Sequence, residues 1–237
     1  MNKVPMKSAL PRSKQAGFTL VEIAIVLVII GLLLGGILKG QEMINQAKIK
    51  NLINDFNGLS AAMYSYQDRY RAMPGDELDA NTNTRWTGAR GGDGNGTFRR
   101  GVAVLATDVY NSPALAPTVT SSESLLFWLH LRLAGFVPGA TDITLAASTQ
   151  QPNNSVNGIV GVQTAGLDFT SNIICTSNLS DKIAIAVDTQ LDDGTARTGQ
   201  IRAHLQTGPN PAAPAATGVT DVYAETGVNQ YLLCKNL

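Results

Sequence analysis

The stretch from Phe18 to Leu38 reads FTLVEIAIVLVIIGLLLGGIL and decides how the chain is organised. It contains 21 residues and a single charged side chain, that of Glu22. At about 1.5 Å per residue, a helix of this length measures about 30 Å, which matches the hydrocarbon core of a bilayer. The stretch therefore predicts one membrane-spanning helix.

Basic residues precede this stretch without an acidic partner: Lys3, Lys7, Arg12 and Lys14. Their positive charge predicts that the N-terminus is cytoplasmic and that the rest of the chain lies outside. Of the 18 basic residues, 14 remain beyond this segment, against 18 acidic ones. No nucleic-acid partner is therefore evident. A hydrophobic content of 44% excludes a fully disordered chain.

A cleavable secretory signal peptide is the ordinary explanation of a basic segment followed by an apolar run. Three features oppose it here: the run is longer than usual, no A-x-A cleavage site closes it, and Glu22 lies within it. A carboxylate in a membrane helix is costly unless it has a partner. Glu22 therefore predicts a cationic partner.

The sequence Gly17-Phe-Thr-Leu-Val-Glu22 resembles the processing motif of prepilins in the type IV pilin and type II secretion pseudopilin superfamily. The resemblance implies that a prepilin peptidase cuts between Gly17 and Phe18 and methylates the new amine. It also implies that Glu22 neutralises the terminal amine of a neighbouring subunit. Burying the two charges together costs less than burying either alone.

We therefore expect a structural subunit of a type IV pilus-like filament. The implied partners are prepilin peptidase, identical or related pilin subunits and an inner-membrane assembly platform. The implied location is the bacterial inner membrane, with one span and the head outside the cytoplasm, followed by an extracellular or periplasmic filament. A type II secretion pseudopilin is the alternative. Lys39 stands where many major pilins carry a proline, which points to a minor pilin or a pseudopilin, although pilins without this proline also assemble. A membrane-anchored enzyme or receptor domain is a more distant one.

Apolar residues continue from Ile44 to Tyr70, mostly in steps of three and four, and predict that one amphipathic helix extends outward to about Pro74. A helix over residues 18–72 would be about 80 Å long. Its steps drift from a strict heptad, so packing on a sheet is favoured over a coiled coil. We expect a pilin-like α+β fold, with this helix packed on an antiparallel sheet. The predicted parts are a leader at 1–17, a transmembrane or filament-core helix at 18–39, a stem at 40–72 and a globular head at 73–237.

Residues 74–119 are rich in Gly, Asn, Asp and Thr and predict an extended loop. Asp93 and Asn95 place side-chain oxygens at alternate positions between glycines, as in the first half of an EF-hand loop. Calcium is therefore the candidate cofactor, with Asp93 and Asn95 as its ligands. A polar turn cluster without an ion is the alternative.

The calcium loop is incomplete. Thr97 offers a third oxygen, but Val104 occupies the twelfth position, where an EF-hand has Glu. The remaining ligands would have to be backbone carbonyls, water or distant acids such as Asp76 or Asp79.

The sequence Thr120-Ser-Ser-Glu123 predicts a capping box that opens a helix through Leu133, closed by Gly135. The helix is apolar on most faces, so we expect it to be buried in the head or at a subunit contact. His130 lacks a second ligand at metal-binding spacing and is expected to be a core or interface residue.

Five segments with apolar or alternating patterns predict strands: Ile159–Val162, Ile173–Ile174, Ile183–Val187, Gln200–Leu205 and Tyr231–Cys234. Between the third and fourth, Leu191-Asp-Asp-Gly194 predicts a hairpin turn. The segment Pro209–Thr217 predicts an exposed loop.

Cys175 and Cys234 are the only two cysteines, and outside the cytoplasm we expect them to form a disulfide. In type IV pilins a C-terminal disulfide commonly ties the last loop to the sheet, and these cysteines are similarly placed. Free buried thiols are the alternative. The sequence contains no G-x-S-x-G or H-E-x-x-H motif and no nucleophile with an identifiable base, so we expect no enzymatic activity.

Overall fold

A computed structural model describes residues 17–101, 108–118, 120–210 and 221–237. Its contacts divide the chain into two units, Met1–Ile44 and Asn45–Leu237. The elements in chain order are helices α1 (Leu20–Tyr70), α2 (Asp79–Arg85) and α3 (Glu123–Leu133), the 3-10 turn η1 (Ala146–Ser148), strands β1 (Val160–Gly166) and β2 (Phe169–Ser180), helix α4 (Asp181–Leu191), and strands β3 (Ile201–Leu205) and β4 (Gln230–Asn236).

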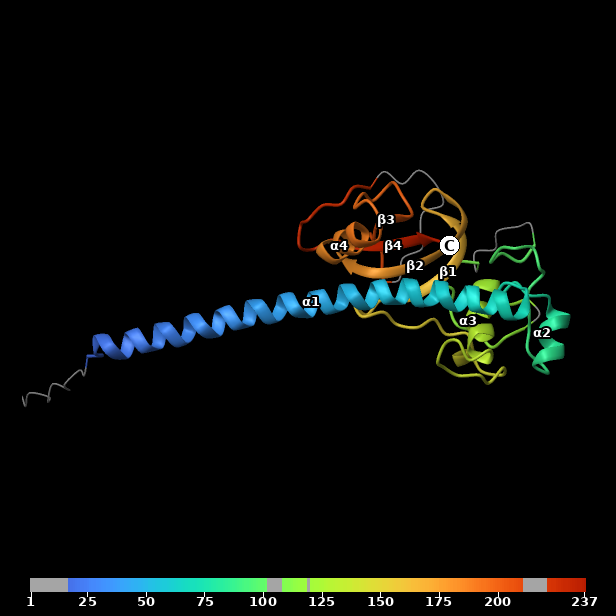
Figure 1. Ribbon diagram of the computed structural model, residues 1–237, viewed down its shortest axis with the longest axis horizontal. Helices are drawn as coiled ribbons and strands as arrows, with labels where there is room; N and C mark the ends of the chain where they lie inside the picture. Colours follow the sequence, from blue (N-terminus) through green and yellow to red (C-terminus); the bar gives the residue numbers. More distant parts are fainter. Residues whose placement is uncertain (1–16, 102–107, 119, 211–220) are drawn as a thin grey trace, which may run out of the picture. The chain divides into compact units, whose positions relative to one another are not determined.

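The long helix predicted over residues 18–72 is present as α1. It ends where Arg71 adopts the left-handed conformation, with φ at 55°, just before Met73 and Pro74. Within the second unit, α1 lies along the sheet (Figure 1) and buries one stripe of residues. The buried residues of α1 are Ile49, Leu52, Phe56, Leu59, Ala62, Met63 and Tyr66.

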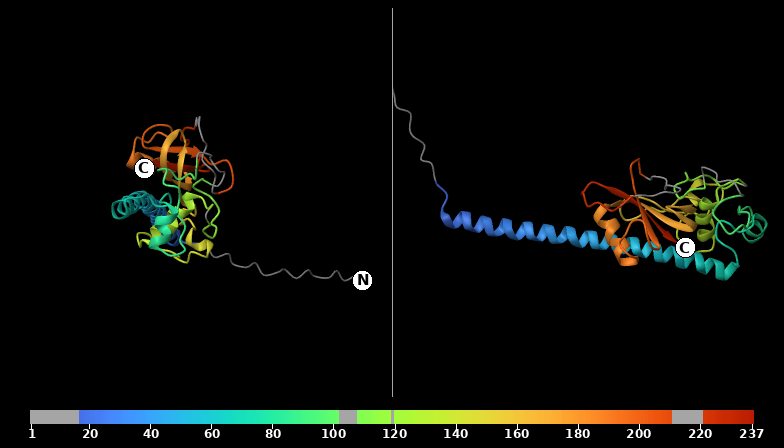
Figure 2. Two further views of the ribbon diagram at one scale, coloured as in Figure 1. Left: turned by 90° about the vertical axis from the view of Figure 1, so that its right-hand side faces the viewer. Right: turned by 90° about the horizontal axis from the view of Figure 1, so that it is seen from above.

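The head contains a four-stranded antiparallel sheet in the order β1-β2-β4-β3. Alternate residues point to opposite faces of the sheet. Val162, Ile174 and Leu233 share one core with the buried stripe of α1 and with residues of α3 and α4. The end-on view in Figure 2 shows α1 and α3 on the same side of this sheet. The arrangement confirms the pilin-like α+β fold.

The opposite face of the sheet has its own, smaller core. Ile173, Cys175 and Leu232 belong to it, and Tyr110 and Leu167 from outside the strands complete it. The head therefore buries both faces of its sheet, one under helices and the other under a loop and a hairpin end.

The strand predicted at Ile183–Val187 is wrong, because these residues lie in α4. Five residues of alternating Ile and Ala satisfy a helical period as well as a strand period. In α4, Ile183, Ala184 and Val187 form a buried helical face. The segment Leu191–Gly194 is consequently not a hairpin turn and connects α4 to β3.

Two further predictions need correction. The helix predicted from Thr120 begins at Glu123, with Ser122 as N-cap and no capping side-chain hydrogen bond, so no capping box forms. The loop predicted over 74–119 contains the short helix α2. The predicted loop Pro209–Thr217 lies outside the described residues from position 211 onward.

Candidate functional site

Thr19 and Glu22 cap the start of α1. The Thr19 hydroxyl accepts a hydrogen bond from the Glu22 backbone N–H at 3.2 Å, and Glu22 Oε2 accepts from the Thr19 N–H and hydroxyl, both at 2.8 Å. This reciprocal pair is a capping box. The spacing of Thr19 and Glu22 in the sequence contains the signal for this capping box, which was not predicted.

The capping box places the Glu22 carboxylate in the first turn of α1, close to the Gly17–Phe18 junction. Glu22 is exposed, and the Phe18 side chain is 83% exposed. In the part of the chain that the structure describes, no basic side chain forms an ion pair with Glu22. The carboxylate is therefore accessible to a cation from another molecule.

The first half of α1 is apolar and uncovered. Of the described helices, α1 is the one long and apolar enough to cross a membrane, and none of its most apolar window is buried. Gly31, Gly35, Gly36 and Gly40 would meet no atom within 4 Å if they carried a Cβ. Their two G-x-x-x-G spacings leave room for another helix to approach closely.

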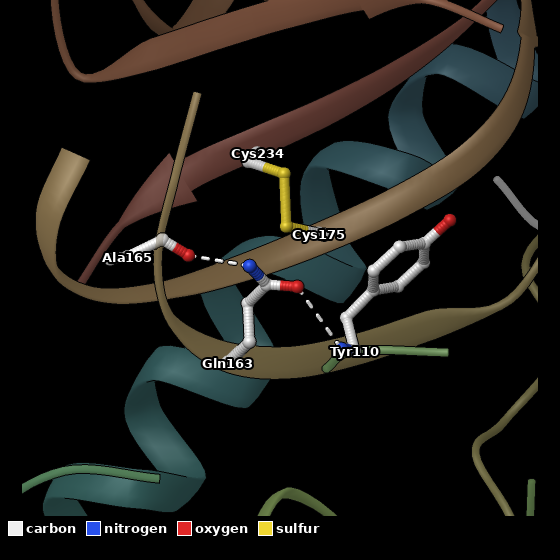
Figure 3. The surroundings of a disulfide bond; sticks show 5 residues. All are labelled: Tyr110, Gln163, Ala165, Cys175 and Cys234. Atoms are coloured by element: carbon white, nitrogen blue, oxygen red, sulfur yellow. Dashed lines mark hydrogen bonds between the residues drawn. A yellow bond between two sulfur atoms is a disulfide. The ribbon is translucent and has the colours of Figure 1, made fainter. Parts of the chain in front are cut away.

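The predicted disulfide is present. Cys175 of β2 and Cys234 of β4 are directly paired in the strand register and fully buried. Figure 3 shows the bridge beside Gln163, whose side chain accepts a hydrogen bond from the Tyr110 N–H at 3.2 Å and donates one to the Ala165 carbonyl. The bridge therefore joins two neighbouring strands, and does not tie the last loop to the sheet as the resemblance implied.

The structure places the two predicted calcium ligands differently. Asp93 lies in a cluster with Asp76 and Glu123, in which one carboxylate oxygen from each residue lies within 4.8 Å of the others. The side-chain oxygen of Asn95 accepts hydrogen bonds from the backbone and hydroxyl of Thr97 at 2.8 and 2.6 Å. Asn95 therefore closes a local turn.

Asp79 is engaged by other residues, and the twelfth loop position is not described by the structure. Asp79 accepts a hydrogen bond from the Gly91 N–H at 2.9 Å and lies 3.7 Å from Arg90. Val104 lies outside the described residues. Calcium binding stays a prediction. The sequence pattern predicted Glu123 as part of a capping box, so it gave no link between Glu123 and the loop that contains Asp93.

His130 is a core residue, as predicted. It is fully buried, its Nδ1 accepts a hydrogen bond from the Gly75 N–H at 2.9 Å, and its Nε2 lies 2.8 Å from the Arg90 carbonyl. Burial lowers the pKa of His130 to about 4. A neutral imidazole with its proton on Nε2 satisfies both hydrogen bonds. His130 therefore links the turn at Gly75 to the loop at Arg90.

The fold and the N-terminal geometry define a pilin-like protein whose apolar helix begins at an accessible carboxylate. Residues 12–38 match the family described as the prokaryotic N-terminal methylation motif, which is typical of type IV pilins and type II secretion pseudopilins. The chain is thus a prepilin-like protein with a cleavage and methylation motif.

The motif has consequences for the class of protein. It implies processing by prepilin peptidase and assembly with other pilins. The apolar helix with this motif indicates membrane anchoring before assembly into a filament. Pilin-like proteins are generally structural subunits rather than enzymes. Searches of curated proteins and of solved structures found no match to this chain.

Proposed function

We propose that this protein is a structural subunit of a type IV pilus-like filament. The observation that carries the proposal is the start of α1, where an exposed Glu22 lies in the first turn of an uncovered apolar helix within the matched motif. In the proposed filament, Glu22 pairs with the methylated terminal amine of Phe18 in a neighbouring subunit. This pairing neutralises both charges where the apolar helices pack together.

The proposal assigns a role to each part of the chain. Residues 1–17 are the leader that prepilin peptidase removes. Residues 18–39 first span the inner membrane and later form the filament core, and residues 40–72 connect this core to the head at 73–237. The head lies outside the cytoplasm, where an oxidising compartment is consistent with the buried Cys175–Cys234 disulfide.

Purified surface filaments test the proposal directly. We expect mass spectrometry of the intact subunit to give a chain that begins at N-methylated Phe18, in filaments of which this subunit is a component. A Gly17→Arg variant should stay uncleaved and be absent from the filaments. Intact Met1 in assembled protein, or normal filament incorporation of Gly17→Arg, would contradict the proposal.

A type II secretion pseudopilin is the second candidate, because Lys39 in place of a helix-kinking proline fits a pseudopilin as well as a minor pilin. A strain that lacks this protein separates the two functions. Loss of surface filaments with normal protein secretion supports the pilus subunit. Loss of secretion with no change in surface filaments supports the pseudopilin.

A further inference from the structure

Three carboxylates from separate segments meet beside the start of α3. Asp76 follows the end of α1, Asp93 lies in the glycine-rich loop, and Glu123 is the first residue of α3. One oxygen of each lies within 4.8 Å of the others. Asp76 is 4% exposed and Glu123 is fully buried. The fold therefore brings two buried acids together with Asp93, which is exposed.

One oxygen of this cluster lacks a partner. Glu123 Oε1 accepts a hydrogen bond from the Asp93 N–H at 2.9 Å, but Oε2 is buried and has no hydrogen-bond partner among the described residues. An unsatisfied buried carboxylate oxygen is strongly unfavourable. The carboxylate of Glu123 faces those of Asp76 and Asp93. A ligand that satisfies its free oxygen would therefore be shared with these two carboxylates.

Among the described residues no basic side chain forms an ion pair with the cluster, although the charge of Arg100 acts to lower the pKa of Glu123. The guanidinium of Arg100 donates to the backbone carbonyls of Gly91 and Ser121, at 2.5 and 3.2 Å. Burial raises the pKa of Glu123 to about 8, and the charges of Asp93 and Asp76 also act to raise it. Without a bound cation, burial and the charges of Asp93 and Asp76 therefore favour the protonated form of Glu123.

A second acidic cluster in the head provides a contrast. Asp188 lies near Asp192 and Asp193. However, its two oxygens accept hydrogen bonds from the Gly194 N–H at 3.2 Å and the Tyr223 hydroxyl at 2.6 Å. Backbone N–H groups likewise donate to both oxygens of Asp76 and both oxygens of Asp93. The cluster beside α3 therefore differs from the second one in the unsatisfied Glu123 Oε2.

We propose that Asp76, Asp93 and Glu123 bind one calcium ion. Calcium takes six to eight oxygen ligands and accepts irregular geometry, and backbone carbonyls and water supply the oxygens that side chains do not. Three carboxylates suit a hard divalent cation. Glu123 provides the acid that the loop lacks at its twelfth position, and it comes from a segment 30 residues beyond Asp93.

The bound ion would join the turn after α1, the glycine-rich loop and the start of α3. The backbone at Gly92 already lies against this cluster, since a Cβ there would be 2.5 Å from Glu123 Oε1 and 2.6 Å from the Asp76 Cα. Calcium would therefore act as a structural cross-link in the head. This inference does not depend on the proposed filament function.

Thermal unfolding of the full-length protein in mild detergent tests the site, with tryptophan fluorescence as the signal. With a dissociation constant of about 0.1 mM, typical of extracellular calcium modules, calcium at about 10 mM should raise the melting temperature by about 5–10 °C relative to chelator. Calorimetry should give one calcium per chain. Magnesium at the same concentration should raise the melting temperature less.

Glu123→Gln preserves the size and the hydrogen-bond acceptor of the side chain and removes its charge. We expect this variant to fold, to melt in chelator at or above the wild-type temperature, and to lose the calcium-dependent rise. Asp193→Asn, in the other acidic cluster, should keep the calcium-dependent rise in melting temperature. An unchanged wild-type melting temperature in calcium, an equal effect of magnesium, or a calcium effect that persists in Glu123→Gln would overturn the assignment.

Discussion

Glu77 keeps its charge inside the head because two donors meet its carboxylate. Its Oε2 accepts a hydrogen bond from the Tyr66 hydroxyl at 2.5 Å and lies 2.7 Å from a guanidinium nitrogen of Arg85. Burial alone raises the pKa of Glu77, but the hydrogen bonds from Arg85 and Tyr66 outweigh it, so the pKa lies below its ordinary value. The end of α1 is thereby fastened to α2.

Removing Arg85 should leave the Glu77 carboxylate buried without its charged partner and so destabilise the head. The Glu77 side chain is 1% exposed and that of Arg85 28% exposed. After a discount for this partial exposure, we expect Arg85→Met to lower the free energy of unfolding by about 2 kcal/mol. Chemical denaturation of the full-length protein in detergent measures the change.

A matched control is Arg71→Met, which removes a guanidinium from an ion pair with Asp68 whose side chains are 84% and 82% exposed. Such surface pairs contribute little, so this variant should unfold almost like the wild type. Adding Glu77→Gln to Arg85→Met should recover part of the loss. Equal effects of the two arginine variants would show that burial of Glu77 is not the cause.

His130 should make the head less stable in acid. The pKa of His130 is lowered from 6.5 to about 4, chiefly by burial, while Glu77 and Asp79 act to raise it and Arg85 to lower it. Between these pH values the unfolded chain binds a proton that the folded chain excludes. Stability is therefore fully present above about pH 6.5 and decreases as the pH falls toward about 4.

The expected loss from this group is at most about 3 kcal/mol, because each pKa unit corresponds to about 1.4 kcal/mol. His130→Gln cannot titrate, and its stability should depend less on pH between 6.5 and 4 than that of the wild type. Denaturation series across this range compare the two slopes. The same slope in both proteins would rule out His130 as the acid-sensitive group.

At the scale of elements, the disulfide joins β2 to β4 through directly paired residues. It closes a loop with a sequence separation of 59 residues, which includes α4 and β3. Closing a loop of this length restricts the unfolded chain and stabilises the fold by up to about 4 kcal/mol. The bridge therefore constrains the register of these strands and the chain between them.

Replacing both cysteines by alanine should lower the free energy of unfolding by about 3 kcal/mol. The measurement compares the double variant Cys175→Ala, Cys234→Ala with the wild type by chemical denaturation without reductant. Wild-type protein denatured with reductant present should behave like the variant. If the variant unfolded at the wild-type midpoint without reductant, the bridge would make no contribution to stability.

At the scale of the whole molecule, assembly should depend on the charge of Glu22. The capping box shows that this carboxylate also accepts hydrogen bonds within its own chain. Glu22→Gln keeps an oxygen for these bonds and removes the charge that would neutralise a neighbour's amine. We expect the variant to be cleaved normally and to stay in the membrane, but to be missing from sheared filaments.

Thr19→Val is the matched variant, because it removes the hydroxyl of the capping box and leaves the charge of Glu22 in place. It should still enter filaments. Immunoblots of membrane and sheared fractions from strains with each variant as the sole copy measure both effects. Wild-type filament yield from Glu22→Gln would contradict the proposed pairing.

The amino-acid pattern alone was enough to predict the processing motif, the length of α1 and four of the strand positions. These features are local, because a periodicity over about fifty residues or a motif of six residues can be recognised without knowledge of distant contacts. The assignment of α4 failed because a run of five residues is ambiguous between the two periods, and packing of its face against the core decides between them.

The partners of Glu123 could not be predicted from the sequence and follow from the three-dimensional fold. From the sequence, Glu123 was the last residue of a capping box, and Asp93 was paired with its near neighbour Asn95. The chain fold brings Asp76, Asp93 and Glu123 together over 47 positions and leaves Glu123 Oε2 buried without a partner. Such a cluster depends on long-range contacts that no local pattern encodes, because each acid taken alone resembles an ordinary turn or helix-start residue.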